Sequence, residues 1–254
     1  MAIPAILAGK RIAVLGSASG LGLAVVRAAQ AAGAEVHGID GMRNFEGLAA
    51  FYRADLSDAA TPEALAHSLP DGLDGLALFP ALPDAGPADI LAQGLIAPRD
   101  LALALGAKLA PRASILVRAA PMSHHWADCL PETRAAMALR PSGIAGFVTR
   151  WGLDAEPARA PRVAGWAMLG FAMAQRWRWA ARDIRINALT PASKDGYLPP
   201  ETSAARGHDG ARGIMDAAQA ALFLLSDLSS GMAGANLASD GGLSAQIRCR
   251  HDGL

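Results

Sequence analysis

Short apolar runs alternate along this chain with longer segments in which apolar residues recur at helical spacing. The runs typical of buried strands are residues 11–16, 34–40, 51–56, 73–79, 113–119, 184–190 and 234–242. The segments with helical periodicity are residues 20–33, 61–70, 98–110, 162–182 and 214–226. Strands that alternate with helices predict a parallel sheet covered by helices on both faces. The predicted fold class is therefore α/β, with one doubly wound, Rossmann-type sheet.

Composition is consistent with a globular domain and narrows the classes of function. Apolar residues make up 52% of the 254 residues and charged residues 18%, which argues against disorder. There is neither an internal repeat nor an interdomain linker, so we expect a single domain over residues 1–254. The 23 basic and 23 acidic side chains cancel, which argues against a nucleic-acid or membrane partner. Cys129 and Cys249 lack paired spacing, and the start lacks a basic leader, so we expect a cytoplasmic protein.

A glycine-rich turn follows the first predicted strand. Gly16, Gly20 and Gly22 lie in "GSASGLG", between that strand and a helix. Glycine permits a tight turn and a close backbone approach, and the helix N-terminus offers free N–H groups and a positive dipole end to a pyrophosphate. This arrangement predicts a dinucleotide-binding loop.

Two acidic residues follow the next strands. Asp40 ends the second strand, where a carboxylate is positioned to bind the ribose hydroxyls of a dinucleotide. Its charge would repel a 2′-phosphate and favours NAD over NADP, although Arg43 lies nearby and keeps NADP open. Asp55 ends the third strand and is a candidate for the adenine edge. The alternative for both acids is helix capping or solvation in a loop.

These motifs resemble the short-chain dehydrogenase/reductase family. The resemblance covers nearly the whole chain through "GSASGLG", "IDG", "ADLSD", "DIRINALTPA" and "SDGG", and looks nearest to the bacterial 3α-hydroxysteroid dehydrogenase/carbonyl reductase group. It implies an inserted helical segment within residues 121–160. It also implies further dinucleotide contacts at Ser17, Ser19, Leu21, Leu56 and Pro191.

The same resemblance shows that the catalytic residues of the family are missing. Family members transfer a proton with a tyrosine that a lysine activates, while a serine orients the substrate and an asparagine supports a proton relay. Counted back from Asn187, the tyrosine falls on Pro161 and the lysine on Gly165, and the serine falls on Ala120. The asparagine falls near Gly94. Proline and glycine carry no proton donor, so the usual catalysis should be absent.

Other residues are candidates for a relocated acid. Tyr197 and Lys194 follow the sixth strand, where family loops close over the nicotinamide. Ser123, His124 and His125 follow the position of the missing serine, and a histidine is suited to acid–base work near neutral pH. The alternative is that Tyr197 anchors a loop and that the others are solvated surface groups. The spacing of the histidines predicts no metal site.

Large side chains occur around the whole predicted helix 162–182. They are Trp166, Met168, Phe171, Met173, Trp177 and Trp179. Because they cover more than one face, a partner subunit or the inserted segment must cover part of them. A homodimer or a homotetramer is expected, also because an uncharged, apolar-rich chain tends to associate.

Three hypotheses of function follow. The first is an NAD(H)-binding pseudoenzyme that acts through binding or assembly, with room for a small apolar ligand. The second is an NAD-dependent oxidoreductase acting on a hydroxy or carbonyl compound with Tyr197, His124 or His125 as a relocated acid. The third is a redox-neutral or purely structural protein without cofactor, which an aromatic or apolar side chain filling the adenine pocket would favour.

Overall fold

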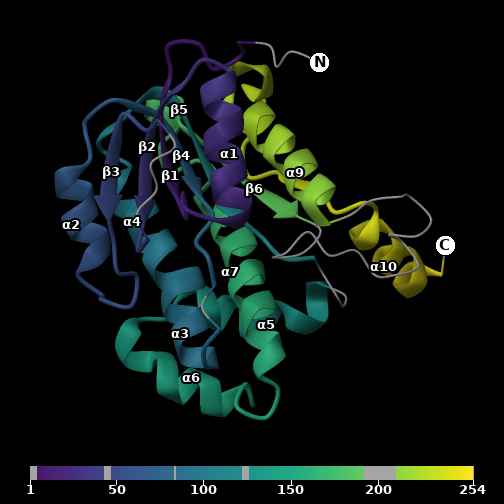
Figure 1. Ribbon diagram of the computed structural model, residues 1–254. Coiled ribbons are helices and arrows are strands. Elements are labelled where there is room, and N and C mark those ends of the chain that lie inside the picture. Colours follow the sequence, from purple (N-terminus) through teal and green to yellow (C-terminus); the bar gives the residue numbers. More distant parts are fainter. Residues whose placement is uncertain (1–4, 43–46, 83, 122–125, 192–209, 254) are drawn as a thin grey trace.

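One parallel sheet forms the centre of the molecule (Figure 1). The computed structural model describes residues 5–42, 47–82, 84–121, 126–191 and 210–253. The strand order is β3-β2-β1-β4-β5-β6-β7, and every neighbouring pair is parallel. The strands are β1 (Arg11–Leu15), β2 (Glu35–Asp40), β3 (Ala50–Arg53), β4 (Leu73–Leu78), β5 (Leu109–Arg118), β6 (Arg185–Pro191) and β7 (Asn236–Ser239). The doubly wound sheet predicted from the alternating pattern is confirmed.

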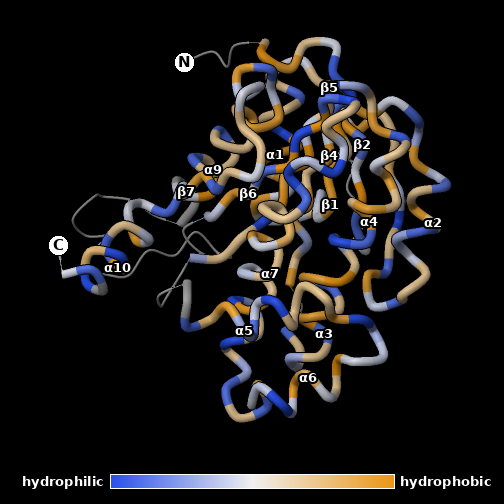
Figure 2. Tube along the Cα trace, turned by 180° about the vertical axis from the view of Figure 1, so that it is seen from behind, coloured by the Kyte–Doolittle hydropathy of each residue, from blue (hydrophilic) through white to orange (hydrophobic). Residues whose placement is uncertain are grey.

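Both faces of the sheet are buried, which explains why the strands are apolar at successive positions. On β1, Ile12 and Val14 contribute to the core under α1 (Gly20–Ala31) and α9 (Gly210–Leu225). Ala13 and Leu15 contribute to the opposite core, under α2 (Thr61–Ser68), α4 (Ala97–Leu105) and α7 (Ala160–Gln175). Figure 2 shows hydrophobic segments in the central strands and hydrophilic ones more often in the outer elements.

Most of the described segment between β5 and α7 is helical, as the resemblance implied. It contains α5 (Trp126–Met137), the short 3-10 turns η2 (Pro141–Gly143) and η3 (Pro157–Arg159), and α6 (Ile144–Arg150). In Figure 1 α5 and α6 lie with α3 (Pro87–Leu91) below the sheet. Contacts of α5 with α7 and of α6 with α3 hold the inserted segment to the rest of the protein.

The predicted helix over residues 162–182 is too long. The helix α7 ends at Gln175, and the 3-10 turn η4 (Ala180–Arg182) follows. Trp179 packs so closely on Gly106 that a Cβ there would lie 2.3 Å from its indole nitrogen. The guanidinium group of Arg182 donates hydrogen bonds to the carbonyl groups of Gly106, Ala107 and Leu109. These long-range contacts draw the chain toward the start of β5 and end the helix early.

The large side chains of α7 are covered mainly from within the chain. Trp166, Met168 and Phe171 are buried, and the inserted α5 packs on this helix. Met173 and Trp177 remain 43% and 70% exposed, and the guanidinium of Arg176 lies 4.0 Å from the Trp177 ring centroid. Of the two covers expected from the sequence, the structure shows the inserted segment packed on α7.

Three helical elements differ from the sequence prediction in other ways. The helix predicted over residues 98–110 corresponds to α4, and the helical region begins before it, because α3 and the π-helical turn η1 (Ala92–Ile96) lead directly into α4. The 3-10 turn η5 (Asp227–Ser229) and the helix α10 (Leu243–Asp252) were not predicted. The sequence of α10 is polar and lacks a continuous apolar stripe, so its periodicity gives no helical signal.

Candidate functional site

The candidate site lies where the strand order reverses. Strand β1 has β2 on one side and β4 on the other, so the connections after β1 and β4 leave in opposite directions. Ligands of open α/β sheets bind in the crevice at the carboxyl ends of such strands. The backbone N–H of Phe79 donates to the carbonyl of Leu15 at 3.0 Å and joins the two strand ends at this point.

The glycine-rich loop has no room for side chains at two of its glycines. Gly16 has a φ of +84°, and a Cβ there would lie 1.9 Å from the carbonyl oxygen of Phe79. A Cβ at Gly22 would lie 2.0 Å from the carbonyl oxygen of Gly16. Ser17 and Leu21 are buried beneath the loop, and the first turn of α1 contains no acidic residue. The first turn of α1 itself therefore places no negative charge at the positive end of the helix dipole.

Asp40 joins the loop to the second strand. Its Oδ2 accepts a hydrogen bond from the backbone N–H of Ala18 at 2.9 Å, and its Oδ1 accepts from the N–H of Met42 at 3.0 Å. A carboxylate has about four acceptor positions, so Asp40 keeps acceptor capacity for a ligand hydroxyl.

A cavity of about 780 Å³ opens beside Asp40. Asp55 lies on its wall, and two hydrogen bonds from Ser57 hold the pKa of Asp55 below its ordinary value. Arg53 of β3 stands opposite Asp40 of β2 in the strand register, and it also lines the cavity. The described residues around it include no aromatic side chain, although the apolar side chains of Met42 and Leu56 line it. The cavity is lined by Leu15, Gly16, Ser19, Asp40, Gly41, Met42, Arg53, Ala54, Asp55, Leu56, Pro80, Ala81 and Gln93.

The positions at which the resemblance places the family's serine, tyrosine and lysine, Ala120, Pro161 and Gly165, lie at the junction of β5 and α7. Gly165 of α7 lies directly against Ala120, which follows β5. A Cβ at Gly165 would lie 2.5 Å from the Cβ and 2.6 Å from the backbone nitrogen of Ala120. Because part of this contact is backbone, the helix occupies the space that a longer side chain would need. Pro161 stands one turn earlier, and Gly94 lies in the π-helical turn.

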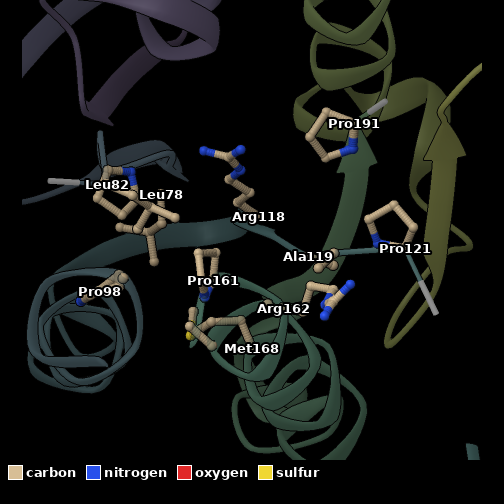
Figure 3. A pocket seen from close by; sticks show the side chains of 15 residues that line it. Leu78, Leu82, Pro98, Arg118, Ala119, Pro121, Pro161, Arg162, Met168 and Pro191 are labelled. Atoms are coloured by element: carbon tan, nitrogen blue, oxygen red, sulfur yellow. The ribbon is translucent and has the colours of Figure 1, made fainter. Parts of the chain in front are cut away.

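A second cavity, of about 220 Å³, lies at this junction and is mainly apolar. Figure 3 shows the rings of Pro98, Pro121, Pro161 and Pro191 around it. Among the described residues of its wall, the charged side chains are those of Arg118 and Arg162, whose guanidinium groups lie apart from one another (Figure 3). Pro80 lines both this cavity and the larger one beside Asp40.

A buried ion pair fixes the inserted segment beside this second cavity. Both carboxylate oxygens of Glu132 accept hydrogen bonds from Arg159, at 2.9 and 2.8 Å, and the Glu132 side chain is only 7% exposed. Arg159 also donates to the carbonyl of Trp151, and the indole of Trp166 donates to the carbonyl of Pro121. The pair thus connects α5 with the start of α7.

Replacing Arg159 by methionine should lower the free energy of unfolding by about 3 kcal/mol, because it leaves a buried carboxylate without its partner. Chemical denaturation measures the change. Arg162→Met is the control, since its partner Glu156 is exposed and such pairs contribute at most about 1 kcal/mol. Equal effects of the two replacements would contradict this reading of the Glu132 pair.

Several residues singled out in the sequence lie outside the described part of the chain. These are Arg43, Ser123, His124, His125, Lys194 and Tyr197. Within the described residues no three His, Cys, Asp or Glu side chains gather as metal ligands. No helix among those residues has both the length and the apolarity to cross a bilayer.

The fold is that of the short-chain dehydrogenase/reductase structures. The 3α-hydroxysteroid dehydrogenase from Pseudomonas sp. B-0831, solved with NADH, superimposes with a TM-score of 0.75 at 23% identity, over 95% of this chain and 99% of that one. The aldohexose dehydrogenase of Thermoplasma acidophilum, ligand-free, gives 0.68 at 16% identity, over 94% and 95%. A short-chain dehydrogenase family protein of Francisella tularensis gives 0.66 at 19% identity, over 93% and 99%. The sequence matches no protein-family model, and no curated protein matches it.

Three residues of the site were not predicted from the sequence. Arg53 lines the larger cavity, Arg118 lines the apolar one, and the carbonyl of Phe79 closes the space above Gly16. Arg53 and Arg118 were read only as parts of strands. Both stand at the last position of a strand, and that place at the carboxyl edge of the sheet was the available signal.

Proposed function

We propose that this protein binds a nicotinamide adenine dinucleotide at the reversal of the sheet and acts through that binding rather than through the hydride transfer of ordinary dehydrogenases. The adenosine half would lie in the cavity between Asp40 and Asp55, and the pyrophosphate would lie against Gly16 and the start of α1. Ser19, Gly20, Leu56 and Pro191 are the further contacts that we assign. Two features of the loop support this assignment: Gly16 and Gly22 allow the tight turn in which backbone packs on backbone, and Gly20 at the start of α1 is exposed with no atom within 4 Å of the place of its Cβ.

One observation carries the second half of this proposal. Gly165 lies against the backbone of Ala120, so the lysine and serine positions of the family are occupied by a helix–strand contact. The catalytic side chains are therefore not simply replaced by smaller ones, because the packing of α7 on Ala120 also occupies the space that they would need. A dinucleotide bound here would have neither a phenol at Pro161 nor an ammonium group at Gly165 beside it.

Calorimetric titration of the whole chain with NADH tests the binding, and the absence of binding at millimolar NADH would remove the proposal. The absorbance of NADH, followed with a panel of steroids, aromatic ketones and quinones, tests the absence of turnover. Any turnover that is lost in Tyr197→Phe or His124→Ala would instead assign an oxidoreductase with a relocated acid.

Asp40 provides a specific prediction. Asp40→Asn keeps the shape of the side chain but removes its charge and places an amide group opposite one of two backbone N–H donors. We expect NADH affinity to fall about 30-fold, and the ratio of NADH to NADPH affinity to fall as well. Calorimetry with both dinucleotides measures these changes.

The control for this replacement is Asp154→Asn, an exposed acid on the inserted segment. It should bind NADH as the unaltered protein does. An unchanged preference for NADH over NADPH in Asp40→Asn would contradict the role of Asp40, and would direct attention to Arg53 as the residue that faces the ribose.

A further inference from the structure

The apolar cavity differs from the adenosine cavity in its chemistry. Its wall consists largely of proline, leucine, alanine and glycine residues from six elements or their ends. Under the proposed function, on which this inference rests, the nicotinamide ring would enter this cavity, because Pro80 lines both spaces and the position of the lost catalytic groups borders it. The residues of the wall then determine whether the oxidised or the reduced ring binds more tightly.

The two redox forms of the ring differ by one charge. The oxidised ring is a cation, whereas the reduced ring is neutral. Transfer of a cation from water into an apolar space is unfavourable unless an anion or several acceptors compensate it. No carboxylate is present among the described residues of the cavity wall. The charged groups there are Arg118 and Arg162, and both have interaction partners; Arg162 is paired with Glu156 at 3.3 Å.

We infer that this cavity selects the reduced dinucleotide, so that the protein distinguishes NADH from NAD⁺ by the charge of the ring. The adenosine and pyrophosphate contacts are common to both forms and contribute equally to their affinities. The selection comes from the apolar wall, whose described residues offer a cation no carboxylate. A protein without hydride-transfer groups would then report the redox state of the dinucleotide without altering it.

Three ligands separate this inference from the proposed function. The whole chain is titrated calorimetrically with NADH, NAD⁺ and ADP-ribose, which lacks the nicotinamide ring. We expect NADH to bind at least about tenfold more tightly than NAD⁺, and NAD⁺ to bind no more tightly than ADP-ribose. Absence of binding by all three ligands would overturn the proposed function itself. Binding of ADP-ribose together with equal affinities for NADH and NAD⁺ would overturn this inference alone.

A pair of variants at Leu82 tests the role of charge. Leu82 is half-buried on the cavity wall and faces Gly94 of the π-helical turn, where its Cδ2 lies 2.5 Å from the place of a Cβ. Leu82→Glu places a carboxylate in the wall, and Leu82→Gln places a neutral group of the same size. We expect Glu to reduce the preference for NADH about tenfold and Gln to leave it nearly unchanged.

ADP-ribose affinity serves as the control in both Leu82 variants, since it reports whether the rest of the site is intact. A Glu variant that binds ADP-ribose normally and keeps the full preference for NADH would overturn the electrostatic explanation. If both variants lose ADP-ribose binding, the comparison of the three ligands on the unaltered chain decides the inference.

Discussion

Gly165→Ala should lower the free energy of unfolding by about 3 kcal/mol, although alanine is the better helix former. The added methyl group would stand 2.5 Å from the Cβ and 2.6 Å from the backbone nitrogen of Ala120, and 3.1 Å from the carbonyl carbon of Ala119. Backbone atoms cannot rotate out of the way as a flexible side chain can, so α7 would have to move away from the residues that follow β5. Denaturant-induced unfolding, followed by circular dichroism, measures the loss.

Gly146→Ala is the matched control. Gly146 is also a helical glycine, but it lies in α6, is exposed, and has no atom within 4 Å of the place of its Cβ. We expect that replacement to stabilise the protein by about 1 kcal/mol. If both glycines respond alike, the close contact between α7 and β5 is absent in solution.

The same contact has a consequence for attempts to restore catalysis. The triple variant Ala120→Ser, Pro161→Tyr and Gly165→Lys recreates the family residues but requires two larger side chains at the closest point of the helix–strand packing. It should unfold more easily than the unaltered protein and should show no NADH turnover. A stable and active triple variant would show that the site was merely stripped of side chains and not closed by packing.

The second large effect is expected at the dinucleotide loop. Gly16→Ala introduces a methyl group 1.9 Å from the carbonyl oxygen of Phe79 and requires alanine to adopt a φ of +84°. The two effects together should destabilise the protein by about 4 kcal/mol and abolish measurable NADH binding, because the turn that presents the loop to the pyrophosphate is displaced. Thermal unfolding and NADH titration below the unfolding temperature measure both.

Gly231→Ala is the control for Gly16→Ala. Gly231 is exposed, and the place of its Cβ is open. Its replacement should leave both the unfolding temperature and NADH binding nearly unchanged. If the Gly16→Ala protein binds NADH normally, the dinucleotide does not use this loop.

How far the sequence predicts each element depends on how local its cause is. The strands were found because burial on both faces makes them continuous apolar runs, as Ile12 to Leu15 show. The glycine loop was found because its geometry depends on neighbouring residues. The end of α7 was missed because it depends on Trp179 packing on Gly106 and on hydrogen bonds from Arg182 to the start of β5.

The amino-acid sequence by itself determined the alternation of strands and helices and the glycine turn, since both depend on residue type and near spacing. Only the tertiary structure decided that Gly165 lies on the backbone of Ala120, that Arg53 and Arg118 line the two cavities, and that the inserted α5 covers α7. Those features join residues far apart in the chain, and packing between elements, rather than local preference, fixes their distances.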